Sequence, residues 1–270
     1  MASLGFSVDE LLPRARGGGA LKMGLTALSE SDWLQPSPDL AARAAAFDSY
    51  PESVQLTPLA HAAGEELAAM LGVSGGLEGA ARSVWEDICL LSADGYREPY
   101  RLIGAAVTFP TDWHPAEKLG QPLIGLHKPI HGYGEQLASG VDHFMANLKP
   151  GRIFGRCNWF VSPTSSLRWI DTEPPAQTFA HVTPHNAGKT LFVRCERQTL
   201  RRLPETGAVV FTIGVYRTAL GKLAPANILR MADALATIPA EEAERRGAAH
   251  FAPQLQTFAA NVLASTAGSS

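Results

Sequence analysis

The chain has 270 residues, of which 46% are hydrophobic and 18% charged, so it can bury a substantial core. Its formal net charge of −3 excludes a general attraction to phosphate backbones or anionic lipid, and we expect no nucleic-acid and no membrane partner. No apolar stretch approaches the roughly 20 residues that span a bilayer. Three cysteines without paired spacing, and a start that lacks an export signal, predict a cytoplasmic protein with reduced thiols.

Residues 1–82 are predicted to form an N-terminal helical arm. Two Ser/Thr-Pro pairs, at 37–38 and 57–58, each offer a capping side chain followed by a first-turn proline. These signals predict helices over 39–47 and 59–71. The second helix has an apolar stripe, and we expect it to dock on the central domain.

The central domain is predicted to span residues 83–222. Two β-rich runs, 84–91 and 101–109, are separated by an Ala-Asp-Gly turn signal at 93–95. A crossover with mixed helical and turn signals follows over 110–151. Three more strands are then predicted, at 153–161, 190–198 and 208–217. The order of two strands, a helical crossover and three strands favours an antiparallel sheet with helices on one face, an α+β fold.

The remaining segments are a loop and a second group of helices. Residues 162–189 contain four prolines and no clear period, which predicts a long loop that covers a site. Helices are predicted over 225–235 and 240–263, the second broken at Pro253. They form a C-terminal helical cap, residues 223–270, whose tail is too small and polar to hold structure.

Two of the predicted strands carry charge where strands usually carry hydrocarbon. On a pleated strand, Arg194 and Glu196 share one face, and Arg156 and Asn158 share a face of the other strand. Adjacent strands could therefore wall a pocket with these four side chains. Burying them unpaired costs several kcal/mol, so such a pocket needs partners, a ligand or a function. The alternative is a solvated sheet face with weak cross-strand salt bridges.

The crossover contains two histidines, His127 and His131. Their spacing of four would place both on one face of a helix as zinc ligands, but Pro129 and Gly132 argue against a regular helix. A single imidazole that projects toward the sheet, and a histidine that only bonds to backbone in a turn, are both open interpretations. The sequence has no phosphate-binding loop, no dinucleotide fingerprint after a strand and no Gly-x-Ser-x-Gly motif.

Several runs of residues occur together in a recognisable order between about residues 20 and 220. They are Lys22–Leu25 with Trp33, Trp85–Leu91, Phe109-Pro110 with Trp113, Glu117–Gly120, Ile124–Pro129, Arg156–Trp159 and Arg194–Pro204. Together they resemble the DUF3445 family. That family includes the α subunit of haem-dependent oxidative N-demethylase, also called dimethylamine monooxygenase.

The resemblance implies a PAS-like fold that binds haem b, and the strand order predicted above agrees with that fold. In haem-binding PAS domains a histidine of the crossover ligates the iron, and polar residues of the later strands face the oxygen side. By this analogy His127 is the axial ligand. Arg194 and Glu196 line the distal side, with Arg156 and Asn158 as companions.

The resemblance also implies an activity, which is O₂-dependent oxidative N-demethylation (N-dealkylation) of a small amine with release of an aldehyde. Glu196 would hold the cationic amine and influence its proton, while Arg194 would stabilise charge on oxygen. The sequence shows no flavin or nicotinamide fingerprint and no four-cysteine cluster. The resemblance therefore implies a separate reductase that carries FMN and a 2Fe–2S centre and takes electrons from NADPH.

Alternatives follow from the same residues. Where the family pattern has a second proline, this chain has His131, which leaves the iron ligand open between His127 and His131. A non-catalytic haem or gas sensor on a PAS scaffold is the alternative to an enzyme, because fold does not decide function. A metal hydrolase that uses both histidines with a carboxylate is a third interpretation.

Overall fold

The computed structural model describes residues 3–15, 23–95, 98–128 and 132–267. The chain divides into two compact units. The first unit comprises residues 1–4, 21–156 and 197–214, and the second unit comprises residues 5–20, 157–196 and 215–270. The division into an arm, a central domain and a cap stays a prediction.

The strands of the described residues form one seven-stranded sheet with the order β1-β5-β6-β7-β3-β4-β2. Their bounds are β1 Thr26–Leu28, β2 Val54–Leu56, β3 Asp87–Ser92, β4 Arg101–Ala106, β5 Ile153–Ser162, β6 Phe192–Arg202 and β7 Val209–Ala219. The pairs β1–β5, β2–β4, β3–β4 and β3–β7 are antiparallel. The predicted α+β class and all five predicted strands are therefore confirmed.

Strands β1 and β2 were not predicted. Both fall inside the arm that was expected to be helical, and each has three residues, too few to show an alternating pattern. They pair with β5 and β4, which places them at the two ends of the sheet order.

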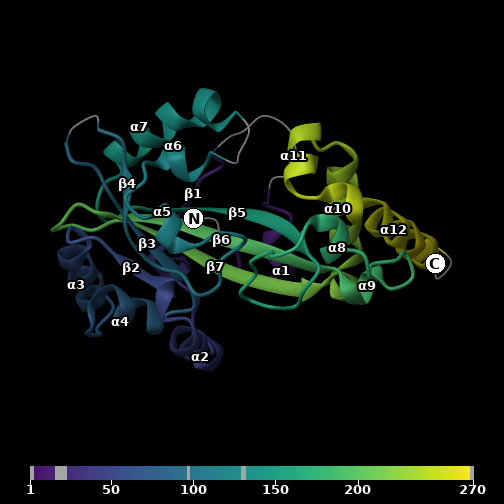
Figure 1. Cartoon of the computed structure of the whole chain (residues 1–270), viewed down its shortest axis with the longest axis horizontal. Coiled ribbons are helices and arrows are strands. Elements are labelled where there is room, and N and C mark those ends of the chain that lie inside the picture. The colour runs from purple at the N-terminus through teal and green to yellow at the C-terminus, as the bar shows by residue number, and fades with distance from the viewer. Residues whose placement is uncertain (1–2, 16–22, 96–97, 129–131, 268–270) are drawn as a thin grey trace. The chain divides into compact units, whose positions relative to one another are not determined.

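The helices of the first unit lie on both sides of the sheet, so the prediction of helices on one face was wrong. In Figure 1, α6 and α7 lie on one side of β3 and β4, and α2, α3 and α4 lie on the other. The predicted helices of the arm are confirmed as α2 and α3. The bounds are η1 Glu30–Asp32, α2 Ala41–Ser49, η2 Pro51–Ser53, α3 Ala60–Met70, α4 Gly76–Arg82, α5 Pro115–Lys118, α6 Leu123–Leu126, η3 Gly134–Ala138 and α7 Ser139–Asn147.

A β-bulge sets which side chains of β4 face α6 and α7. Leu90 pairs with Gly104 but Leu91 pairs with Leu102, so Ile103 is the extra residue. The shift keeps Leu102 on the same face as Leu91, under the crossover. The core there is formed by Cys89, Leu91, Tyr100, Leu102, Ala105, Val107, Leu123, Met145, Leu148, Leu200 and Val209.

The second unit contains the remaining helices. Their bounds are α1 Val8–Leu11, α8 Pro175–Thr178, α9 Ala187–Thr190, η4 Leu220–Lys222, α10 Pro225–Ala236, α11 Ala240–Arg245, η5 Ala248–His250 and α12 Ala252–Ala267. The expected long loop over 162–189 thus contains two one-turn helices, α8 and α9. Among the described residues, none of the helices combines the length and the hydropathy that a membrane crossing requires.

Two predictions about the C-terminal helices were wrong. Pro253 does not break a helix, because it lies in the first turn of α12, where a proline costs no hydrogen bond. The interruption is at Gly247, whose φ of 61° is the left-handed conformation that glycine adopts without strain. The expected unstructured tail is helical as far as Ala267.

Candidate functional site

The alternation of side chains predicted for β5 is confirmed by burial. Phe154, Arg156 and Asn158 are half-buried. Cys157 and Trp159, which alternate with them along the strand, are buried. The polar side chains therefore share one face of the strand. The pleat of the strand puts the neighbouring residues, Cys157 and Trp159, on the other face.

A hydrogen bond from Arg156 shows which face of β6 continues the polar face of β5. Its Nε donates to Oε1 of Gln198 at 2.7 Å, and β5 and β6 are neighbours in the sheet. Leu200, two residues further along β6, belongs to the core beneath the crossover, and Phe154 packs against that core. Within the first unit, Arg156 and Gln198 thus lie on the sheet face that the crossover covers.

His127 lies at the C-terminal end of α6 and is half-buried. Its Nδ1 lies 2.8 Å from the backbone oxygen of Leu123. A carbonyl can only accept, so Nδ1 carries the proton and Nε2 keeps a free lone pair. Burial lowers the pKa of His127 to about 4, and the charges of Arg156 and Lys118 act in the same direction. The imidazole is therefore neutral near pH 7, with one nitrogen able to bind a metal.

Tyr133 packs flat on this imidazole. The two ring centroids lie 4.3 Å apart with an interplanar angle of 11°. The ring is 5% exposed, and its hydroxyl is buried without a hydrogen-bond partner among the described residues. Burial raises the pKa of Tyr133 to about 12, so the hydroxyl keeps its proton. A buried hydroxyl without a partner among the described residues, on a ring that stacks on an imidazole, is the kind of group that a bound ligand satisfies.

The other predicted ligand, His131, lies outside the described residues. Within the part of the chain that the structure describes, no three His, Cys, Asp or Glu side chains cluster as a bare metal site. The choice of iron ligand between His127 and His131 therefore stays open.

The remaining predicted site residues, Asn158, Arg194 and Glu196, belong to the second unit. Arg194 is 1% exposed, and its Nη1 donates to the backbone oxygen of Leu167 at 2.7 Å. This bond ties the 162–189 segment to β6. Glu196 is 8% exposed, so the structure does not support the alternative of a solvated charged face at these two positions.

Arg246, next to α11, was not predicted and supplies a positive charge near Glu196. Burial lowers the pKa of Arg246, and the negative charges of Glu242 and Glu196 oppose that shift. Its Nη1 donates to the backbone oxygen of Trp159 at 2.7 Å, and its guanidinium lies 5.3 Å from the ring centroid of Phe160. The second unit thus holds an arginine and a carboxylate together in a buried setting.

The three cysteines are free and buried, as the sequence predicts for reduced core thiols. Cys157 and Cys195 lie on neighbouring strands. A hydrogen bond with Cys157, together with burial, raises the pKa of the Cys195 thiol. A thiol with a raised pKa is a poor nucleophile, so Cys195 contributes packing.

Residues 59–256 match the family described as haem-dependent oxidative N-demethylase, alpha subunit-like. The match covers well over half of the chain and includes β3 to β7 with the crossover. The chain belongs to this family. Its description implies dependence on haem and, as an α subunit, a partner subunit.

The residues of the first unit fit the group that this family uses. A haem is held by a side chain with a lone pair and needs an apolar wall for the macrocycle. Nε2 of His127 has a lone pair of this kind. Several apolar side chains pack against the core but are only partly buried, so they can form such a wall. They are Trp113, Leu126, Val141, Phe144, Phe154 and Phe211. Three features of this chain suit a haem: the lone pair on Nε2 of His127, the Tyr133 hydroxyl, which has no partner in the part of the chain that the structure describes, and these side chains.

Proposed function

We propose that the chain carries out haem-dependent, O₂-using oxidative N-demethylation (N-dealkylation) of a small amine, with release of an aldehyde. The observation that carries the proposal is His127, a neutral imidazole whose Nδ1 is held by the Leu123 carbonyl and whose Nε2 therefore carries the lone pair. Membership of the N-demethylase alpha-subunit-like family supports the same chemistry.

The strand order supports a PAS-like arrangement within this proposal. Leaving aside the short end strands β1 and β2, the sheet has the order β5-β6-β7-β3-β4. The crossover with α5, α6, η3 and α7 connects β4 to β5. A histidine from this crossover, His127, would then hold the haem iron, as in haem-binding PAS domains.

The polar residues have separate roles in the proposal. When bound, haem supplies the oxidising power for attack on the N-methyl carbon. Glu196, whose charge is balanced by Arg246, binds the ammonium form of the amine. Its carboxylate accepts a hydrogen bond from the ammonium N–H and so influences the proton of the amine. Arg194 holds the 162–189 segment against β6 through the Leu167 carbonyl, and its positive charge would stabilise negative charge that develops on oxygen. Burial keeps His127 neutral, the charge of Arg156 adds to this effect, and Arg156 is held by Gln198.

Electrons come from outside the chain in this proposal. The family description as an α subunit supports a separate partner. We assign that partner the FMN and 2Fe–2S centre of an NADPH-dependent reductase. We expect the assembly to work in the cytoplasm.

The test is turnover by the purified, haem-loaded chain. With dimethylamine, O₂ and a chemical or enzymatic reductant, it should consume O₂ and release formaldehyde in equal amounts with monomethylamine. If haem-loaded protein never releases aldehyde from any small secondary or tertiary amine, the catalytic role is excluded. A haem sensor would then be the better account.

A further inference from the structure

The second unit contains a small cavity that the haem chemistry does not use. It has a volume of about 200 Å³. The lining residues are Leu12, Ala15, Trp159, Arg230, Met231 and Ala234. Four of these are apolar, one is a flat aromatic ring and one is a permanent cation.

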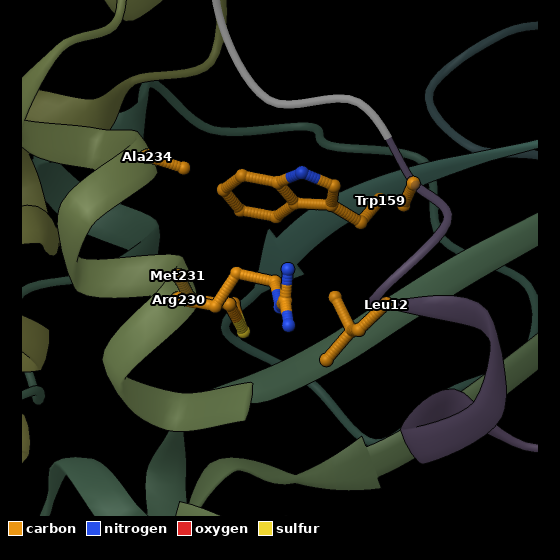
Figure 2. Close-up of a pocket in the computed structure, with 6 residues that line it drawn as sticks. Leu12, Trp159, Arg230, Met231 and Ala234 are labelled. Carbon is orange, nitrogen blue, oxygen red and sulfur yellow. The ribbon is translucent and has the colours of Figure 1, made fainter. Parts of the chain in front are cut away.

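The flat wall is the indole of Trp159. Trp159 is 3% exposed and projects from the face of β5 opposite to Arg156 and Asn158. Figure 2 shows this indole across from α10, with the side chain of Leu12 below it. A planar, apolar ligand body can stack on such a ring, and aromatic stacking adds to the gain from burial.

The cation is Arg230 of α10. Its guanidinium reaches from the helix into the space between the indole and Leu12 (Figure 2). Within the part of the chain that the structure describes, no carboxylate forms an ion pair with Arg230. By contrast Arg246, which lies 5.1 Å from the same ring, is paired with Glu242. The positive charge of Arg230 therefore remains available to an anion.

The size of the cavity limits the ligand. Pockets for drug-sized molecules measure roughly 300 to 1,000 Å³, so this one suits a single ring or a short chain. Arg230 itself is exposed, which opens the cavity to solvent beside the guanidinium. A guanidinium binds a carboxylate with two parallel hydrogen bonds, a geometry that a neutral amide cannot reproduce.

We infer that this cavity is a binding site for a small organic anion with a flat apolar body, such as an aromatic carboxylate. The ring stacks on Trp159 and packs against Met231 and Ala234, while the carboxylate pairs with Arg230. The site is independent of the proposed amine oxidation.

The experiment is titration of the haem-loaded full chain with benzoate, by calorimetry and by ligand-observed NMR. Benzamide is the neutral control of the same shape. Benzoate should bind with a dissociation constant of about 1 mM or below, and benzamide at least about tenfold more weakly. The visible spectrum is recorded in parallel and should not change, because binding at the haem would move it.

Variants then locate the site. Arg230→Gln should weaken benzoate binding at least about tenfold, because it removes the charge while the exposed position tolerates the change. Ala234→Phe should abolish binding by filling the cavity. Arg217→Gln, at another exposed arginine of the second unit, is the matched control and should leave the affinity unchanged. Circular dichroism checks that each variant is folded, and Arg230→Gln decides the question if Ala234→Phe does not fold.

Three results would overturn the inference. They are the absence of saturable benzoate binding at millimolar concentration, equal weakening by Arg230→Gln and Arg217→Gln, and benzoate binding that Arg230→Gln leaves intact.

Discussion

The ring of Tyr133, stacked 4.3 Å from His127, holds the imidazole from one side while the Leu123 carbonyl holds Nδ1. Tyr133→Ala removes that support. A stacked aromatic pair contributes about 0.5–1.5 kcal/mol, so we expect the haem affinity to fall about two- to tenfold. Titration of apo-protein with haemin measures this. Tyr133→Phe keeps the ring and should bind haem about as well as the wild type; an equal loss in both variants would show that the hydroxyl matters instead of the stacking.

Glu196 is the residue that we expect to bind the amine. Glu196→Gln keeps the shape and removes the charge, so kcat/KM for the amine should fall about 10²-fold while the haem content stays the same. Aldehyde release, measured against haem absorbance, gives both quantities. Glu205→Gln, in the exposed turn between β6 and β7, is the control and should behave like the wild type. Unchanged activity in Glu196→Gln would remove this residue from the site.

The buried ion pair between Arg43 of α2 and Asp87 of β3 ties the N-terminal helices to the sheet. The two side chains are 0% and 1% exposed and lie 3.0 Å apart, and Asp87 also accepts bonds from the backbone N–H groups of Thr108 and Phe109. Asp87→Ala leaves a buried arginine unpaired, which should lower the free energy of unfolding by about 3–5 kcal/mol. Urea denaturation measures it. Asp94→Ala, at an exposed turn, should change stability by less than about 0.5 kcal/mol, and a similar loss in both would contradict this role.

The contact of α11 with β5 should depend on pH through Glu242. Although burial raises the pKa of Glu242, hydrogen bonds from Arg245 and the charge of Arg246 hold it below the ordinary value of 4.5. The folded state therefore binds this proton less readily than the unfolded state. Its contribution to stability is present above about pH 4.5 and is lost as the pH falls through the lowered pKa.

Glu242→Gln tests this pH dependence. The variant should unfold at lower urea concentration than the wild type at pH 7, and the difference should shrink below about pH 4. Glu241→Gln, an exposed neighbour, is the control. A difference that stays constant from pH 7 to pH 3 would show that the effect is not electrostatic.

The sequence predicted the longer strands well because their periodicity reflects burial. In β5 the half-buried residues alternate with buried ones along the strand, and this pattern can be read from residue types alone. The three-residue strands β1 and β2 have no such pattern, since they exist only through pairing with β5 and β4. A proline breaks a helix only in its interior, and the sequence did not show that α12 begins at Ala252. The break was therefore predicted at Pro253, although it lies at Gly247.

The candidate site was predictable only in part. The type and spacing of Arg194 and Glu196 left two interpretations open, a walled pocket and a solvated face, and the structure shows that both side chains are buried. The ligand geometry of His127 depends on a one-turn helix, α6, which is too short to show a period. Arg246 lies far along the chain from Glu196, so only tertiary structure brings the two charges near each other. The sequence gives no indication that Tyr133 belongs to the site, because a single tyrosine most often has only a packing role.

The most direct measurement is the absorption spectrum of the reduced, purified chain with and without carbon monoxide, for the wild type, His127→Ala and His143→Ala. His143 is an exposed histidine of α7 and serves as the control. We expect a Soret band that shifts with carbon monoxide in the wild type and in His143→Ala. In His127→Ala this band should be lost while circular dichroism shows an intact fold. A wild-type spectrum in His127→Ala would contradict the assignment of His127 as the axial ligand.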